Sequence, residues 1–333
     1  MKIYLAGDSI VQNYEKEEFI AGWGQFLSFF IKDGVEVVND AKGGRSSRLF
    51  INEGRFDNIE KNISAGDYLL IEFCHNDDAS KEYKTMFNRL TPLGEPDSDG
   101  RFPIIPGEAM PKDYIPPEYI NALRKDENVK DKQAVLDSVY KILESYPHDT
   151  YYPYSADGSK GTYLWFLKQF VDMAREKGAV PVFVTAPART VYDANGNIKD
   201  GAGLHGGNNF AYIRAMKQLG EEAKVPVIDL FAYSCGLYKQ IGKEKIHWIT
   251  SIKKGCNKGI WPDDFNSEMQ KKETVSEDTH FNKYGAMLIT QGLVKLIKES
   301  DSSQLDGLRG MLKNPDGIDI EKYVKKPLVF EEF

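Results

Sequence analysis

The sequence predicts a three-layer α/β/α protein with a central parallel sheet of five strands. Short apolar runs recur along the chain, and amphipathic stretches with helical spacing fill the intervals between them. Gly34 and Gly178 follow two of these stretches, at the place where a left-handed residue closes a helix. Strands that alternate with helices in this way form parallel sheets covered by helices on both faces.

Each predicted strand is one of the apolar runs, and each predicted helix is one of the amphipathic stretches. The strands are expected at residues 3–6, 35–39, 68–73, 180–185 and 225–230. The helices are expected at residues 23–32, 56–65, 162–177, 209–224 and 284–298. A helix between two consecutive strands makes them parallel, because the crossover returns the chain to the same end of the sheet.

Residues from about 84 to 160 depart from this pattern. The segment holds nine of the fifteen prolines and seven of the eighteen tyrosines. Proline fixes φ and removes an N–H donor, which excludes a regular sheet here, although residues 133–143 keep helical spacing. We expect an insertion that forms a structured lid or cap on a single domain of residues 1–333, with a separate small domain as the alternative.

A C-terminal tail follows at about residues 301–333. It carries a short possible helix and ends with an apolar patch at residues 327–330. The patch is expected to dock on the body of the same chain, with a second subunit as the alternative. The insertion and the tail are therefore the expected contacts of any homo-oligomer.

Composition excludes several classes of partner. The chain has 333 residues and a formal net charge of −7, so nucleic acids and anionic membranes are not expected to bind. No apolar run approaches the about 20 residues that cross a bilayer. The first residues lack the apolar segment of a secretory signal, which predicts a cytoplasmic location. Cys74, Cys235 and Cys256 have neither disulfide-framework nor zinc-site spacing, and no metal or organic cofactor is expected.

Small and polar residues follow three of the predicted strands, where ligand sites of open parallel sheets lie. Ser9 comes directly after the first strand and a glycine. A serine nucleophile needs a general base and a third group that orients this base. Of the five histidines, His280 alone has a carboxylate-rich approach, with Glu277 and Asp278 before it in a predicted loop. The structural alternatives are a turn cap at Ser9 and a solvated helix N-terminus at His280.

Donors for an oxyanion come from the other strand ends. Three donors are expected to converge, and they are the backbone N–H groups of Ser9 and Gly44 and the side-chain amide of Asn76. Each such donor lowers the activation barrier of the reaction by about 3–4 kcal/mol. Asn76 taken alone is more often a turn residue than an oxyanion donor. The nucleophile, glycine, amide and histidine nevertheless occur in the chain order and at the strand ends that the chemistry requires.

Four blocks of the sequence, at residues 7–10, 39–48, 66–77 and 278–286, contain these residues. They resemble the SGNH (GDSL-type) hydrolases, and particularly their rhamnogalacturonan acetylesterase branch. The resemblance covers residues 3–77 and about 163–297, but neither the insertion nor the tail. It implies a flavodoxin-like fold, Ser9 as the nucleophile, His280 as the general base, and Gly44 and Asn76 in the oxyanion hole. It further implies a cofactor-free, two-step hydrolysis that removes acetyl groups from plant cell-wall oligosaccharides, here imported fragments.

Two positions depart from the family pattern. Cys74 stands where a glycine is usual, so its side chain either narrows the pocket or points into the core. Glu277 stands where an aspartate is usual, three residues before the histidine. We expect Glu277 to orient His280, with Asp278 as the alternative if one residue has been deleted.

Further residues are candidates for substrate contact. Arg45 and Arg48 either pair with a uronate carboxylate or form ordinary surface ion pairs. Aromatic residues form either a sugar-stacking wall or part of the core, and they are Tyr151, Tyr152, Tyr154, Trp248 and Trp261. Two other functions stay open: a lipase or thioesterase for small acyl esters, and a carbohydrate-binding protein without catalytic activity.

Overall fold

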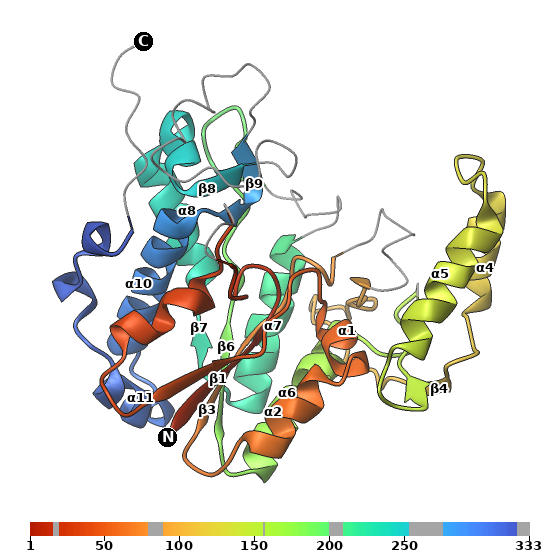
Figure 1. Ribbon diagram of the computed structural model, residues 1–333, viewed down its shortest axis with the longest axis horizontal. Coiled ribbons are helices and arrows are strands. Elements are labelled where there is room, and N and C mark those ends of the chain that lie inside the picture. The colour runs from red at the N-terminus through yellow and green to blue at the C-terminus, as the bar shows by residue number, and fades with distance from the viewer. Residues whose placement is uncertain (16–19, 79–88, 156, 200–208, 253–275, 325–333) are drawn as a thin grey trace.

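The computed structural model describes the chain except residues 16–19, 79–88, 156, 200–208, 253–275 and 325–333. Five parallel strands form its central sheet, in the order β2-β1-β3-β6-β7 (Figure 1). They are β1 (Lys2–Gly7), β2 (Glu36–Asn39), β3 (Tyr68–Glu72), β6 (Val180–Val184) and β7 (Val227–Ile228). The direction of winding reverses between β1 and β3, and ligand sites of this fold lie at that switch point. The predicted fold class, including its flavodoxin-like strand order, is confirmed.

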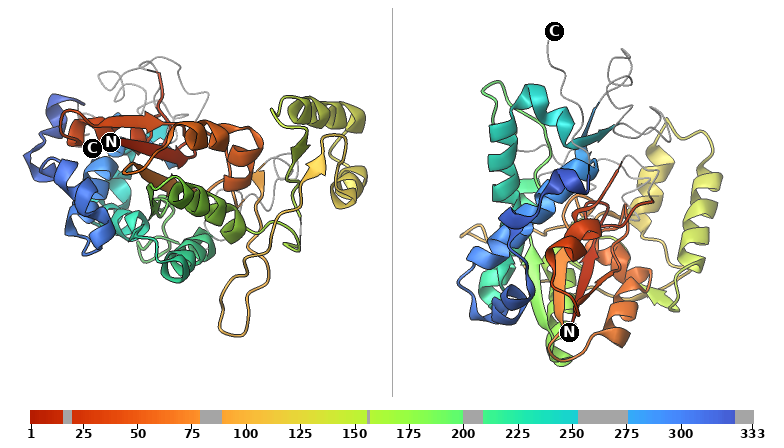
Figure 2. Two further views of the ribbon diagram at one scale, coloured as in Figure 1. Left: turned by 90° about the horizontal axis from the view of Figure 1, so that it is seen from below. Right: turned by 60° about the vertical axis from the view of Figure 1, so that its left-hand side comes forward.

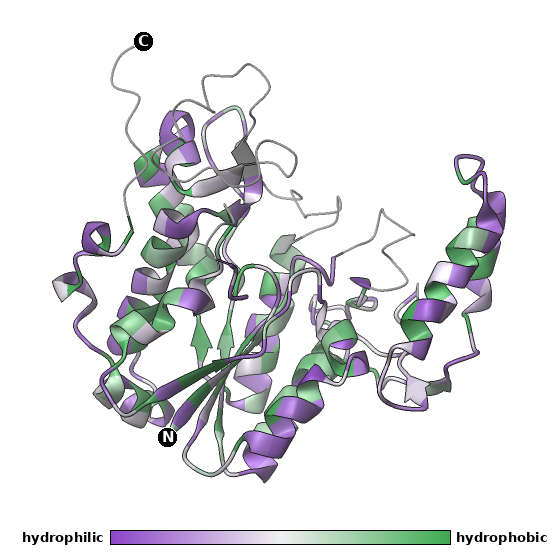
Figure 3. Ribbon diagram, viewed as in Figure 1, coloured by the Kyte–Doolittle hydropathy of each residue, from purple (hydrophilic) through white to green (hydrophobic). Residues whose placement is uncertain are grey.

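Helices cover both faces of the sheet and make three layers. One face carries the 3₁₀ helix η1 (Trp23–Phe30), α8 (Leu230–Ile241) and α10 (Lys283–Glu299). The other face carries α1 (Ser47–Asn52), α2 (Arg55–Asn62), α6 (Tyr163–Glu176) and α7 (Asn209–Ala223). Strand residues alternate between the two apolar layers, so that Leu5 and Leu70 face the first layer and Leu69 and Ile71 the second. Strands β1, β3 and β6 are accordingly buried over nearly their whole length, and β6 and β7 are mainly green in Figure 3, whereas the edge strand β2 is exposed at Glu36.

Two predicted elements differ in the structure. The segment predicted as an α-helix at 23–32 is the 3₁₀ helix η1, whose buried Gly24, Leu27 and Phe30 follow a spacing of three residues. The strand predicted at 225–230 ends at Ile228, because Asp229 caps α8 through its side chain. A periodicity read over so few residues does not separate spacings of 3.0 and 3.6.

The described part of the insertion includes two short strands and a pair of helices. They are β4 (Met110–Pro111), α4 (Pro117–Lys125), α5 (Lys132–Glu144) and β5 (Thr150–Tyr151), and α5 matches the helical spacing seen at residues 133–143. The helix pair stands to one side of the body, beyond α1 (Figure 2). Leu49 of α1 and Leu90 belong to the same apolar cluster as the insertion's own core. The insertion is thus packed onto α1.

Arg48 of α1 connects the body to the insertion from within. Its side chain is 1% exposed. The guanidinium donates from Nε to the carbonyl of Leu90 at 3.0 Å and from Nη1 to that of Tyr152 at 2.8 Å. Burial lowers its pKa. Arg48 therefore stabilises the attachment of the insertion and is neither a surface ion pair nor a uronate contact.

The described part of the C-terminal tail lies on the body. It contains η3 (Ser303–Leu305), α11 (Asp306–Met311), η4 (Pro315–Gly317) and η5 (Ile320–Lys322). Leu308 and Leu312 are buried in the first apolar layer, and the Leu308 N–H donates to Tyr68 Oη at 3.1 Å. The predicted apolar patch at 327–330 lies outside the described residues. Within the described ranges, none of the helices has both the length and the apolar character of a membrane span.

Two glycines of the first layer give a matched test of this packing. A β-carbon on Gly292 of α10 would overlap the ring of Tyr233, whereas one on Gly236 of α8 would meet no atom within 4 Å. We expect Gly292→Ala to lower the free energy of unfolding by about 1–3 kcal/mol. Gly236→Ala is expected to raise it by about 0.5–1 kcal/mol, because it removes a helix-interior glycine. Urea unfolding of both variants measures this, and equal effects would contradict the described packing of α10 on α8.

Candidate active site

Ser9 lies in a tight turn directly after β1. The carbonyl of Asp8 accepts from the N–H groups of Val11 and Gln12, which closes the turn. Tyr14 Oη donates to the Ser9 carbonyl at 3.0 Å. Ser9 is only 9% exposed and is therefore largely buried at the carboxyl end of the strand. These hydrogen bonds fix the direction of the serine side chain.

His280 lies against Ser9, although 271 positions separate the two in the chain. Its Nε2 is 2.7 Å from Ser9 Oγ. His280 belongs to β9 (Ser276–Phe281), which pairs with β8 (Thr250–Ile252) in an antiparallel sheet. The register of this pairing shifts between Thr250 and Ile252. The expectation of a loop at this position is therefore wrong. The strand is positioned by a hydrogen bond of 2.9 Å from the Ala21 N–H to the Phe281 carbonyl.

Asn76 follows β3 and is held by Asp8. Its Nδ2 donates to Asp8 Oδ2 at 3.0 Å, while the N–H of Ile10 donates to Asp8 Oδ1 at 2.9 Å. One buried carboxylate thus orients both the asparagine amide and the turn that carries Ser9. Burial raises the pKa of Asp8 to about 6, and the hydrogen bond from Ile10 and the neighbouring His280 oppose this shift. The sequence analysis did not assign this role to Asp8.

The glycine loop after β2 lies beside Ser9. A β-carbon on Gly43 would lie 3.4 Å from the Ser9 β-carbon, and the Gly43 N–H donates to the Gln12 side chain. Gly44 has a φ of +80°, which a residue with a side chain rarely adopts. Ser46 then caps α1 by accepting from the Leu49 N–H. The structure therefore brings the loop of Gly44 to the turn of Ser9.

Arg89 is a second neighbour of this loop that the sequence analysis missed. Its Nη2 would lie 3.6 Å from a β-carbon on Gly44, and its Nη1 is 3.5 Å from Asn76 Oδ1. The positive charge also opposes the rise in the pKa of Asp8. No motif surrounds Arg89 in the sequence, so only the three-dimensional structure reveals this position.

Asp278 is engaged by a different partner from the one proposed for it. Arg189 Nη2 donates to Asp278 Oδ1 at 2.5 Å, and Thr279 Oγ1 lies 3.1 Å from the same oxygen. Burial raises the pKa of Asp278, but the Arg189 guanidinium outweighs it and holds the pKa below its ordinary value. The side chain of Glu277 lies outside the described residues.

Three other ionisable groups lie buried beneath the site, and they are Glu72, Asp77 and His75. Both carboxylate oxygens of Glu72 lack a hydrogen-bond partner among the described residues, and burial raises its pKa well above the ordinary value. Burial also raises the pKa of Asp77 to about 7, although Ser47 Oγ donates to it at 2.6 Å. Burial lowers the pKa of His75 to about 3, so its ring is neutral. Its Nε2 donates to the Pro187 carbonyl at 3.0 Å, because a carbonyl oxygen only accepts.

The structure decides between the two expectations for Cys74. Its side chain is fully buried and belongs to the apolar cluster that includes Phe50 and Phe73. It therefore points into the core. Burial raises the pKa of its thiol well above the ordinary value. The substitution of the usual glycine leaves the space around Ser9 unaffected.

The remaining candidate residues divide between core and surface. Arg45 forms an ion pair with Glu53, with its Nε 2.8 Å from Oε2. Tyr151 and Tyr154 are buried in the core of the insertion, and Tyr152 packs edge-on against Trp165 and Phe166. Trp248 is partly buried, and Trp261 lies outside the described residues. Among the residues that the structure describes, no histidine, cysteine and carboxylate groups cluster as metal ligands.

The parallel sheet has the order β2-β1-β3-β6-β7, and a serine hydroxyl at its edge lies against an imidazole. A glycine loop and an asparagine amide lie beside this pair. Together these features define a hydrolase of the SGNH class. No model of a known protein family matches the chain. The rhamnogalacturonan acetylesterase RhgT of Bacillus subtilis is 30% identical over 300 residues, which are 90% of each chain. The probable rhamnogalacturonan acetylesterase YesY of the same organism is 30% identical over 298 residues, 89% of this chain and 92% of that protein.

A solved structure agrees with the fold. The crystal structure of YxiM of Bacillus subtilis superposes with a TM-score of 0.52 at 20% identity, and the match covers 91% of this chain and 57% of that one. The chain belongs to the rhamnogalacturonan acetylesterase family of SGNH hydrolases, which are carboxylic ester hydrolases. The resemblance predicted from the four sequence blocks is confirmed.

Asp8→Asn tests the double role of Asp8. An asparagine offers one acceptor oxygen, and its NH₂ would face either the Ile10 N–H or the Asn76 amide. We expect kcat for 4-nitrophenyl acetate to fall by about 10²-fold with KM changed by less than about twofold, because the Asn76 amide, the expected oxyanion donor, is misdirected. Steady-state kinetics measures both constants. An unchanged kcat, in a variant whose circular dichroism matches the wild type, would contradict the role.

Proposed function

We propose that the chain is a serine esterase that removes acetyl groups from plant cell-wall oligosaccharides through an acyl-enzyme. The observation that carries the proposal is the distance of 2.7 Å between Ser9 Oγ and His280 Nε2. It supports Ser9 as the nucleophile and His280 as its general base. The names of the two relatives support an acetylated pectic glycan, rhamnogalacturonan, as the substrate class.

In the first step Ser9 Oγ attacks the acetyl carbonyl carbon while His280 Nε2 accepts the hydroxyl proton. The carbonyl π electrons move to oxygen, which becomes an oxyanion. We assign the N–H groups of Ser9 and Gly44 and the Asn76 amide as its donors. Asn76 Nδ2 carries two hydrogens, and the bond to Asp8 at 3.0 Å uses one, which leaves the other to donate to the oxyanion.

Collapse of the oxyanion breaks the bond to the sugar oxygen. His280 returns its proton to that oxygen, so the sugar leaves as an alcohol and the acetyl group stays on Ser9. A water then attacks the acyl carbon, with His280 again accepting a proton. The second collapse releases acetic acid and restores the Ser9 hydroxyl, with the proton returned from His280.

We propose that Glu277 orients His280 by accepting its Nδ1 hydrogen. The ion pair of Asp278 with Arg189, at 2.5 Å, supports this choice because it gives Asp278 another function. That ion pair, together with the bond of 2.8 Å from the Thr190 N–H to the Asp278 carbonyl, would then fix β9 against the segment after β6. Arg189 and Asp278 would position the histidine strand.

Acetate release from acetylated oligosaccharides tests the proposed function. We expect the wild type to deacetylate pectic fragments and Ser9→Ala to lose about 10⁴-fold or more in kcat, because the variant lacks the proposed nucleophile. Acetylated xylan fragments and 4-nitrophenyl butyrate complete the substrate panel. A preference for longer acyl chains would instead indicate a lipase or thioesterase. Binding of acetylated glycan without acetate release would indicate a protein without catalytic activity.

Glu277→Gln and Asp278→Asn form a matched pair that identifies the orienting carboxylate. We expect Glu277→Gln to lower kcat by about 10³–10⁴-fold, because the histidine loses the acceptor that fixes its tautomer. Asp278→Asn is expected to keep most of kcat and to lower the melting temperature, since the ion pair with Arg189 is lost. The reverse order of the two kcat values would assign the role to Asp278.

A further inference from the structure

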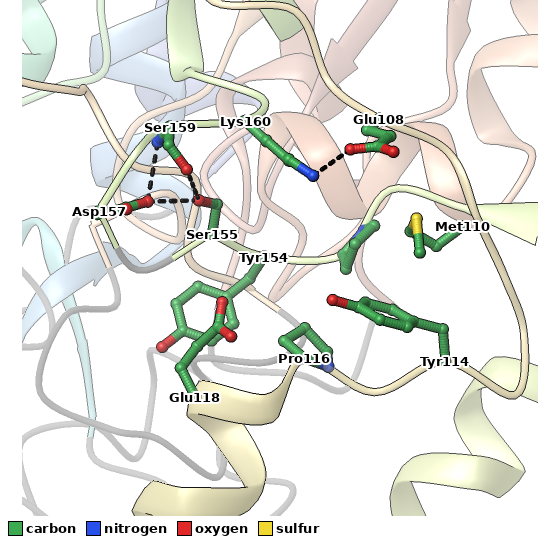
Figure 4. A pocket seen from close by; sticks show the side chains of 11 residues that line it. Glu108, Met110, Tyr114, Pro116, Glu118, Tyr154, Ser155, Asp157, Ser159 and Lys160 are labelled. Atoms are coloured by element: carbon green, nitrogen blue, oxygen red, sulfur yellow. Dashed lines mark hydrogen bonds and ion pairs between the residues drawn. The ribbon is translucent and has the colours of Figure 1, made fainter.

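A pocket lies in the insertion, and Ser9 is not among the residues that line it. Its volume is about 420 Å³, a size that accepts a small organic ligand. Tyr114, Pro116 and Tyr154 form one side, and Lys160 and Glu108 form the side opposite (Figure 4). None of these residues belongs to the site described above. The pocket therefore needs an explanation of its own.

Aromatic faces and hydrogen-bonding groups are combined in this pocket. Tyr114 is half-buried, and its backbone is fixed by a bond of 2.6 Å from Tyr151 Oη to its carbonyl. Tyr154 is 5% exposed and packs in the insertion core. Such rigid rings match the apolar C–H faces of a sugar, whose hydroxyls donate to carboxylates at the rim. The chemistry of the lining fits a carbohydrate unit.

Charge selects among sugars. The pocket is lined by three carboxylates, from Glu108, Glu118 and Asp157, and by one ammonium, from Lys160. Lys160 forms an ion pair with Glu108, and Asp157 accepts from the Ser159 N–H at 2.9 Å. The lining is therefore negative, which repels a uronate carboxylate and accepts the hydroxyls of an uncharged sugar.

Short connections join the pocket to the glycine loop of the active site. Leu49 of α1 packs in the same cluster as Tyr154, and Asn52 of α1 exchanges hydrogen bonds with Tyr152 at 2.9 Å. The other end of α1 begins at Ser47, three residues after Gly44 of the glycine loop. The helix between them is six residues, roughly 9 Å, long.

We propose that this pocket, formed by Tyr114, Tyr154 and Glu118, binds an uncharged sugar unit of the acetylated oligosaccharide. The proposal rests on the proposed function, because it makes the pocket a secondary subsite for the same substrate. It narrows the substrate class to acetylated glycans that also carry a neutral sugar.

Tyr114→Ala tests the subsite by a ratio of two activities. The ratio is kcat/KM for an acetylated neutral oligosaccharide, such as a xylan fragment, divided by kcat/KM for 4-nitrophenyl acetate. We expect it to fall about tenfold in Tyr114→Ala, mainly through KM. Tyr140→Ala is the matched control, because Tyr140 lies on α5 of the same insertion, is 38% exposed and does not line the pocket. An equal ratio in the two variants would overturn the proposal.

Calorimetric binding to Ser9→Ala separates the subsite from catalysis. We expect the deacetylated neutral oligosaccharide to bind about tenfold more weakly when Tyr114→Ala or Glu118→Gln is added. Binding that depends on Tyr114 in a protein whose wild type releases no acetate would support the pocket and refute the proposed function. Tighter binding of an oligogalacturonide than of the neutral oligosaccharide, or affinity unchanged in both variants, would overturn the proposal.

Discussion

The attachment of strand β9 to the segment at Ala21 and to Ile249, just before β8, is the constraint on which the site depends. The Ala21 N–H bonds to the Phe281 carbonyl, and the Asn282 N–H bonds to the Ile249 carbonyl, at 2.9 and 3.1 Å. These backbone bonds do not depend on side-chain identity, yet they align the imidazole with the serine. Because β9 is outside the central sheet, its position is set by this contact, by β8 and by the Arg189–Asp278 ion pair. The Ser9–His280 hydrogen bond is therefore a consequence of tertiary packing as much as of local sequence.

Much of the fold and the position of the reacting pair could be predicted from sequence. The five strands were readable because parallel strands buried on both faces are continuous apolar runs, and Ser9 follows the first of them. The adjacency of His280 followed from its carboxylate-rich approach and its place before the last helix. What sequence could not give were the contacts that depend on three-dimensional packing. Arg48 reads as a surface arginine until burial shows its carbonyl partners, and Arg89 has no local motif.

The charge state of the two carboxyl groups beneath the site depends on their hydrogen bonds, because Asp8 and Glu72 are equally buried. Glu72, without partners among the described residues, favours the neutral acid, whereas Asp8 keeps two N–H donors that favour its carboxylate. The site thus places the ionised carboxylate of Asp8 next to Asn76 and keeps the neighbouring Glu72 neutral. This limits like-charge repulsion between the two groups. The assignment of charge comes from hydrogen-bond supply rather than from the distance to Ser9.

Arg48 limits how the chain can change during evolution. Its guanidinium enters the body from α1 and ends on carbonyls of Leu90 and Tyr152, which flank the two ends of the insertion. A shorter homologue that lacked the insertion would remove these two acceptors from a buried cation. Loss of the segment would therefore require a compensating replacement at position 48, and the two features should be gained or lost together.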